Sequence, residues 1–153
     1  MKLKLLRTSL AFAFILSATL VCLAPAAHAR SCSLHGVAGR YGYTISGTIP
    51  TLGAVAAVGN ISLDAEGNVT GAQTTSFNGA IVKETLSGTY AVNADCTGTA
   101  TISVFHSGVL VRTSSVDVVW DNNQRELRAI FLTAGTVLTV NGRKVFREED
   151  EED

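Results

Sequence analysis

Regularly spaced turn signals constrain this chain more than any other feature of its sequence. Runs rich in β-branched residues alternate with short links of Asn, Asp, Ser, Ala and Gly, which are common in tight turns. Eight runs can be read, at 41–49, 54–63, 69–77, 81–92, 97–105, 109–120, 125–132 and 137–146. The links leave no room for the crossover helices of a parallel sheet, so consecutive runs are predicted to pair as antiparallel hairpins.

Alternation of side chains within the runs predicts which face of the sheet is buried. In 97–105 the even-numbered residues from Ala100 to Val104 are apolar, and the residues between them are Thr or Ser. In 109–120 the predicted apolar face holds Leu110 together with the later Val and Trp side chains. One side of the sheet is therefore expected to be apolar and the other polar.

The predicted fold class is all-β, a single up-and-down meander of about eight strands closed as a small barrel. A flat meander of this length would expose two long unpaired edges, and closure removes both of them. A two-sheet β-sandwich is the alternative architecture. Glycines inside the runs fit strands that coil or bend sharply in a small barrel, and they are Gly42, Gly47, Gly59, Gly71 and Gly88.

The first 29 residues have the pattern of a secretory signal peptide. Three cations precede the uncharged, mostly apolar run 10–23, and the small-x-small sequence that ends at Ala29 fits signal-peptidase cleavage. A retained membrane anchor would need about twenty apolar residues, and a lipoprotein signal at Cys22 would need a small residue before it, where this chain has Val. We therefore predict a secreted or periplasmic protein with no membrane span in the mature chain.

Charge divides the mature chain into a nearly neutral body and an acidic tail. Residues 30–147 carry nine Lys and Arg against seven Asp and Glu, whereas 148–153 are all acidic. We expect 30–147 to form the barrel domain and 148–153 to be a disordered tail. Nucleic-acid binding, which needs a concentrated basic face, is not predicted. A membrane-spanning barrel is also disfavoured, because the aromatic residues form no girdles and several runs carry charges on both faces.

Two cysteines, Cys32 and Cys96, remain after signal cleavage, and an exported protein permits them to pair as a disulfide. The bridge would close a loop of about 65 residues and stabilise the domain by about 4 kcal/mol in the chain-entropy model. The mature chain adds only two histidines, and none of these four residues stands at metal-ligand spacing. We predict a disulfide, no metal site and no cofactor.

No constellation for catalysis is visible in the sequence. The histidines His35 and His106 are expected in solvated positions, and no nucleophile elbow occurs. Four charged residues fall inside strand-like runs, where they either pair on the outer face or act as polar groups of an internal ligand site. These are Glu84, Asp117, Glu126 and Arg128.

Four aromatic residues are the candidate ligand-binding set: Tyr41, Tyr43, Tyr90 and Trp120. They would line a cavity, or else they form ordinary core. The function expected is a non-enzymatic β-barrel module that binds a small apolar molecule or a surface of a cell-envelope partner. A structural or interaction protein of the cell envelope without a ligand, and a cofactor-free barrel enzyme, are the alternatives. The oligomeric state is not predicted.

Two segments resemble known families. Residues 87–99, Ser-Gly-Thr-Tyr-Ala-Val-Asn-Ala-Asp-Cys-Thr-Gly-Thr, resemble a Gly-Thr-Tyr-x-Val-x-x-Asp-Cys-Thr-Gly-Thr signature of small secreted bacterial β proteins of unknown function. Residues 39–43, Gly-Arg-Tyr-Gly-Tyr, are similar to the Gly-x-Trp entry of lipocalin-like (calycin) barrels, with Tyr41 in place of Trp. The first resemblance implies no activity, and the second implies a barrel with an internal cavity.

Overall fold

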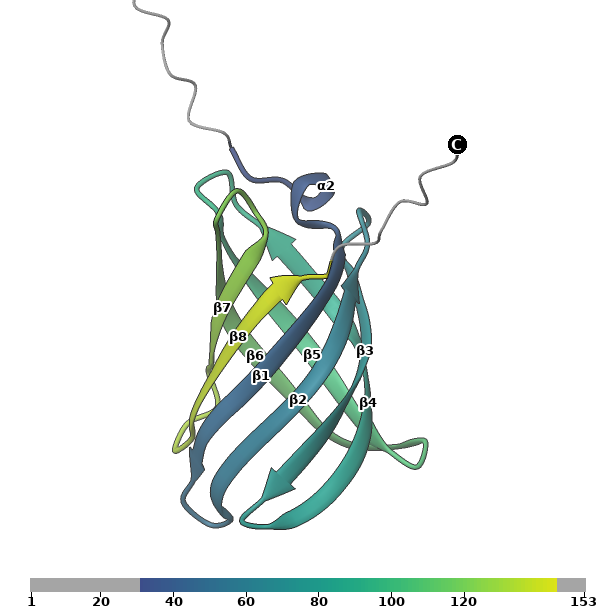
Figure 1. The fold of residues 1–153 in the computed structure, drawn as a ribbon, viewed down its shortest axis with the longest axis vertical. Helices are drawn as coiled ribbons and strands as arrows, with labels where there is room; N and C mark the ends of the chain where they lie inside the picture. Colours follow the sequence, from purple (N-terminus) through teal and green to yellow (C-terminus); the bar gives the residue numbers. More distant parts are fainter. Residues whose placement is uncertain (1–30, 146–153) are drawn as a thin grey trace, which may run out of the picture.

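Eight antiparallel strands close into one barrel in the computed structural model, which describes residues 31–145 (Figure 1). The strands are β1 (Gly39–Ile49), β2 (Gly53–Leu63), β3 (Asn68–Phe77), β4 (Ala80–Val92), β5 (Thr97–His106), β6 (Val109–Asp121), β7 (Glu126–Phe131) and β8 (Val137–Lys144). The eight-stranded barrel predicted from the sequence is confirmed, and the sandwich alternative is wrong. The predicted signal peptide 1–29 and acidic tail 148–153 lie outside the described residues.

The pairing of β1 with β8 closes the sheet. Every strand pairs antiparallel with its neighbours in sequence, and residues 41–48 of β1 also pair with 137–144 of β8. Each strand therefore has a hydrogen-bonded neighbour on both sides. This closure removes the two free edges that an open meander would expose.

Side chains alternate as the sequence predicts, with apolar residues inside and Thr and Ser outside. Val104 and Val118 are buried, whereas Thr99, Thr101 and Asp117 are exposed. Among residues 31–145, no helix is long and apolar enough to cross a membrane.

A β-bulge in β6 corrects one assignment made from the sequence. The register between β5 and β6 shifts after Val104, which pairs with Arg112, so that Phe105 pairs with Leu110 and Val111 is the extra residue. A bulge changes the side of the strand on which the following residues lie. Leu110 was predicted on the apolar inner face, but it lies with Phe105 on the outside and is 54% exposed.

Glycine is required where neighbouring strands approach closely. A Cβ atom at Gly88 would lie 2.0 Å from the Thr101 carbonyl oxygen, and one at Gly59 would lie 2.8 Å from the Cβ atom of Gln73. At Gly42 a Cβ atom would make only an ordinary contact with Val145. The predicted role of strand glycines in close strand approach therefore holds for Gly47, Gly59, Gly71 and Gly88 but not for Gly42.

A short helix that the sequence reading missed, α2 (Leu34–Val37), lies over one end of the barrel (Figure 1). Ser33 is its N-cap and accepts a hydrogen bond from the Gly36 amide at 3.1 Å. A single helical turn has no periodic signal, so only the Ser cap pointed to it. Val37, the last residue of α2, is fully buried in the core.

The predicted disulfide between Cys32 and Cys96 is confirmed, and it ties the segment before α2 to the turn between β4 and β5. The Cys32 amide also donates to the Ala94 carbonyl oxygen at 3.1 Å. The main hydrophobic core lies at this end, where Val37 packs with Tyr90, Trp120 and other side chains. We call this end of the barrel the closed end.

The four hairpin turns at the other end form the open end of the barrel (Figure 1). Large aliphatic side chains that are at least 49% exposed lie in each of these turns or at the start of the strand that follows it, and they are Leu52, Ile81, Val109, Leu110, Leu132 and Val137. The carboxylates in the turns, Asp64, Glu66 and Asp95, lie instead at the closed end, in the links that follow β2 and β4. The two ends therefore differ in chemistry.

Candidate ligand cavity in the barrel

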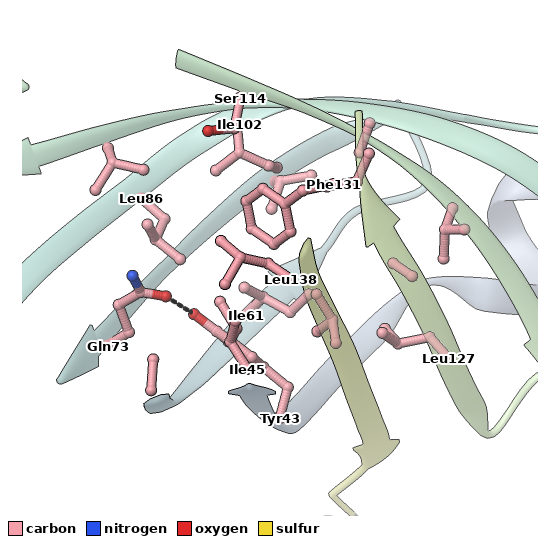
Figure 2. Close-up of a pocket in the computed structure, with 18 of the residues that line it drawn as sticks. Tyr43, Ile45, Ile61, Gln73, Leu86, Ile102, Ser114, Leu127, Phe131 and Leu138 are labelled. Carbon is pink, nitrogen blue, oxygen red and sulfur yellow. Dashed lines mark hydrogen bonds between the residues drawn. The ribbon is translucent and has the colours of Figure 1, made fainter. Parts of the chain in front are cut away.

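An internal cavity of about 120 Å³ runs between the core of the closed end and the open end. Its wall is mostly aliphatic and aromatic, with contributions from every strand. Figure 2 shows the branched side chains of Ile61, Leu86, Ile102 and Leu138 around the space, with the Phe131 ring beside them. An apolar cavity of about 150 Å³ in another protein stays dry and binds benzene, so this one has the size for a small organic molecule.

Three of the four aromatic residues singled out from the sequence line this cavity. Tyr43, Tyr90 and Trp120 contribute to its wall. Tyr41 does not, because its hydroxyl lies 2.7 Å from the Val37 carbonyl oxygen and 3.0 Å from that of Gln124. The structure thus places Tyr41 as the residue that holds α2 on the barrel.

The Tyr90 hydroxyl also forms a contact at the closed end, where it donates a hydrogen bond to the backbone carbonyl of Asp64. Burial, together with the nearby Asp64 and Glu66 charges, raises the pKa of Tyr90 to about 12. Burial raises the pKa of Tyr41 as well, and the neighbouring Tyr90 adds to the effect. Both phenols are therefore protonated hydrogen-bond donors at neutral pH.

One wall of the cavity is polar, and a chain of hydrogen bonds crosses it. The Tyr43 hydroxyl donates to Gln73 Oε1 at 2.7 Å, the contact marked in Figure 2. Gln73 Nε2 donates to Thr75 Oγ1 at 2.9 Å and to Glu84 Oε2 at 2.7 Å. The Thr75 hydroxyl donates to the same Glu84 oxygen at 2.7 Å. We call Tyr43, Gln73, Thr75, Glu84 and Arg112 the polar wall; Glu84 bonds to three of the others but is not itself part of the cavity lining.

The register explains how residues on four strands reach one another. Gly59 lies between Tyr43 and Gln73 in the sheet, since it pairs with both. Gln73 pairs in turn with Glu84 on β4. The missing side chain at Gly59 leaves space across which the tyrosine ring extends to Gln73.

Arg112 completes the polar wall with a two-pronged ion pair. Its Nη1 donates to Glu84 Oε1, and its Nη2 donates to Glu84 Oε2 at 2.9 Å. The guanidinium carbon also lies 5.5 Å from the centre of the Phe77 ring, a cation–π contact. The Arg112 side chain is 34% exposed, whereas that of Glu84 is 2% exposed. Arg112 therefore joins a buried carboxylate to the open end.

The Glu84 carboxylate accepts four hydrogen bonds, three at Oε2 and one at Oε1. Burial alone raises its pKa, but the bonds from Arg112, Gln73 and Thr75 outweigh burial and hold the pKa below its usual value. Glu84 is thus ionised and a weak base.

The other three charges within strands lie outside the barrel. Asp117 is exposed, Glu126 accepts hydrogen bonds from Arg143, and Arg128 pairs with Asp121. The two alternatives weighed for these charges therefore both occur. Glu84 is an internal polar group, and the rest are surface charges.

Neither histidine enters the cavity. His35 is exposed on α2, and His106 is exposed at the end of β5, with its Nδ1 atom 3.0 Å from the Lys83 carbonyl oxygen. Among residues 31–145, no three His, Cys, Asp or Glu side chains are grouped to hold a metal. The cavity therefore brings no histidine to the internal carboxylate.

The sequence reading missed Gln73, Thr75, Arg112 and Ser114, which all line the cavity. The signal was present in the alternation, since Arg112 and Ser114 continue the inward series of β6 that ends at Trp120. Their polar side chains were assigned no role because the inner face was expected to be apolar. The position of a residue in the strand predicted whether its side chain faces the cavity better than the polarity of that side chain did.

Comparisons of this chain with protein-family models, with curated proteins and with solved structures gave no match. The resemblances of residues 87–99 and 39–43 therefore stay predictions. The function must be argued from the cavity itself.

Proposed function

We propose that this protein is an exported, non-enzymatic module that binds a small, mainly apolar molecule inside its barrel. The observation that carries the proposal is the apolar cavity with a single polar wall, since ligand sites typically combine an apolar lining with a few placed polar groups. The cavity volume suits a molecule of about the size of benzene. The disulfide is compatible with export to an oxidising compartment.

The open end supports entry of an apolar ligand. The cavity wall reaches this end, because it includes Ile49, Phe77 and Phe131, the last residues of β1, β3 and β7. Exposed aliphatic side chains also lie in or beside all four turns of the open end. Glu84 and His106 both lie outside the cavity lining, which favours binding over catalysis because neither places a base against a bound molecule.

The proposal can be tested with the only tryptophan in the chain as a reporter. Trp120 lines the cavity and is 3% exposed. The full chain would be expressed with its own leader, and the purified protein would be titrated with 1-hexanol while the Trp120 fluorescence is recorded. We expect a saturable change in fluorescence. Native mass spectrometry of the protein before titration would show any small molecule that copurifies.

Two neighbouring alanines provide a matched pair of variants. Ala57 lines the cavity, whereas Ala56 faces outward on the same strand. Ala57→Phe should fill the space and weaken hexanol binding more than ten-fold, at a packing cost of about 1–3 kcal/mol. Ala56→Phe should bind hexanol as the unmodified protein does. Equal hexanol affinities for the two folded variants, or no saturable binding by the unmodified protein, would contradict the proposal.

A further inference from the structure

The net charge of the polar wall indicates which class of ligand the cavity would accept. Among residues 31–145, Arg112 is the only Lys or Arg side chain that lines the cavity, and both of its terminal nitrogens bond to Glu84. The other two polar-wall side chains that bond to Glu84, Gln73 and Thr75, are neutral. The polar wall as a whole therefore carries no net charge.

Arg112 keeps free N–H donors although Glu84 neutralises its charge. A guanidinium has five N–H donors, and the ion pair with Glu84 uses two of them. The Arg112 side chain is one-third exposed and lines the cavity, so donors remain for a bound molecule. The buried Ser114 hydroxyl lines the same space and makes no side-chain hydrogen bond within the described part of the chain.

A charged ligand would meet an unfavourable balance. A carboxylate placed beside the neutral ion pair would bring one uncompensated negative charge into an apolar cavity, and the buried Glu84 charge would repel it. A neutral carbonyl, amide or hydroxyl would accept a hydrogen bond from Arg112 or Ser114 without that cost. The apolar part of the ligand would then lie among the aliphatic side chains.

We propose that the cavity selects uncharged small molecules that carry a hydrogen-bond acceptor, and that Glu84 sets this selectivity by neutralising Arg112. This inference rests on the proposed function. Glu84 acts here as a positioning residue, since it lies behind Arg112 and does not line the cavity itself. Its removal should convert the same cavity into a site for anions.

Pentanamide and pentanoate are suitable probes, because they have the same number of heavy atoms and nearly the same shape but differ in charge at pH 7. Their dissociation constants would be measured by Trp120 fluorescence and checked by NMR chemical-shift titration. The unmodified protein should bind pentanamide at least ten-fold more tightly than pentanoate. In Glu84→Gln the unpaired Arg112 cation should bind pentanoate at least as tightly as pentanamide.

The control variant is Glu126→Gln, which makes the same substitution in an exposed carboxylate that pairs with Arg143 outside the barrel. It should keep the preference for pentanamide. Arg112→Gln, which removes donors from the cavity wall, should weaken pentanamide binding about ten-fold while hexanol binding changes less. The comparison of pentanamide with pentanoate in the unmodified protein keeps the inference testable if a variant does not fold.

The outcomes separate this inference from the proposed function. Tighter binding of pentanoate than pentanamide by the unmodified protein would overturn the charge selectivity while leaving ligand binding intact. The same holds if folded Glu84→Gln keeps the original preference, or if Arg112→Gln leaves pentanamide binding unchanged. If 1-hexanol, pentanamide and pentanoate all fail to bind, both proposals are wrong.

Discussion

At the scale of single residues, the most consequential contact is the ion pair between Glu84 and Arg112. Glu84 is buried, whereas Arg112 is partly exposed at the open end. Breaking the pair therefore costs different amounts of stability, depending on which side chain is left alone. A carboxylate left alone in the interior has no water to replace its partner. An arginine left alone at the open end can turn its guanidinium toward solvent.

Stability should therefore depend unequally on the two partners. Arg112→Met leaves Glu84 ionised and buried, and it should lower the free energy of unfolding by about 3–5 kcal/mol. Glu84→Gln keeps a hydrogen-bonding side chain and should cost about 1–2 kcal/mol. Urea unfolding followed by circular dichroism measures both. Arg128→Met, in an exposed pair with Asp121, should cost less than about 1 kcal/mol, and equal losses for the two buried-pair variants would refute the argument.

A second prediction at this scale concerns the buried tyrosines and the pH dependence of stability. All three tyrosines of the chain, Tyr41, Tyr43 and Tyr90, are buried, and burial raises the pKa of each. The pKa of Tyr90 rises from 10.0 to about 12. In the unfolded chain the phenols lose protons near pH 10 while the folded chain retains them, so the free energy of unfolding falls as pH rises through this window.

Absorbance at 295 nm and circular dichroism would follow ionisation and unfolding together. Phenolate should appear above pH 10 and in step with loss of the folded signal. A full phenolate signal at pH 10 from a protein that remains folded would show that the tyrosines are accessible. The stability contribution should be fully present at neutral pH, below the pKa of the unfolded chain.

At the scale of elements, α2 and the disulfide fasten one end of the barrel. Cys32 and Cys96 are 64 residues apart in sequence, and Tyr41 and Lys144 each contact a carbonyl of α2 through a hydrogen bond. A helix of one turn is not stable by itself. Its position must come from these tertiary contacts and from the burial of Val37.

Loss of the disulfide should therefore weaken the whole domain. The double substitution Cys32→Ser with Cys96→Ser should lower the free energy of unfolding by about 4 kcal/mol, the value of closing a loop of this length in the chain-entropy model. Urea unfolding gives the measurement, and reduction of the unmodified protein should give the same shift in midpoint. An unchanged midpoint after reduction would show that the bridge does not stabilise the barrel.

At the scale of the whole molecule, stability depends on a pairing between the first and last strands. The contact between β1 and β8 joins residues far apart in sequence, and it converts an open sheet into a barrel. Without it, β1 and β8 would each present a row of unpaired backbone groups. Such edges pair readily with other chains.

A chain that ends at Thr136, and so lacks β8, should aggregate instead of forming a monomeric barrel. Size-exclusion chromatography and thioflavin T fluorescence would detect the aggregates. A chain that ends at Val145 keeps all eight strands and should elute and unfold as the full chain does. A monomeric, cooperatively unfolding chain without β8 would show that closure is not needed for the fold.

The sequence by itself determined the elements and their order. Turn residues such as Asn78-Gly79 act locally, through the backbone angles that they tolerate, and alternation along a strand fixes which side chains share a face. These short-range rules placed each of the eight strands within two residues of its observed ends. The pairing of Cys32 with Cys96 followed from the prediction that Cys22 leaves with a signal peptide, because these two cysteines then remain.

Only the tertiary structure decided the site. The polar wall draws its members from β1, β3, β4 and β6, and their meeting depends on register, on the stagger of a closed sheet and on the bulge that reorients Leu110. No local rule connects Arg112 to Glu84, which is 28 residues away. The interior charge pair, the role of Tyr41 beneath α2 and the size of the cavity all arise from closure, because closure alone brings distant inward side chains into one enclosed space.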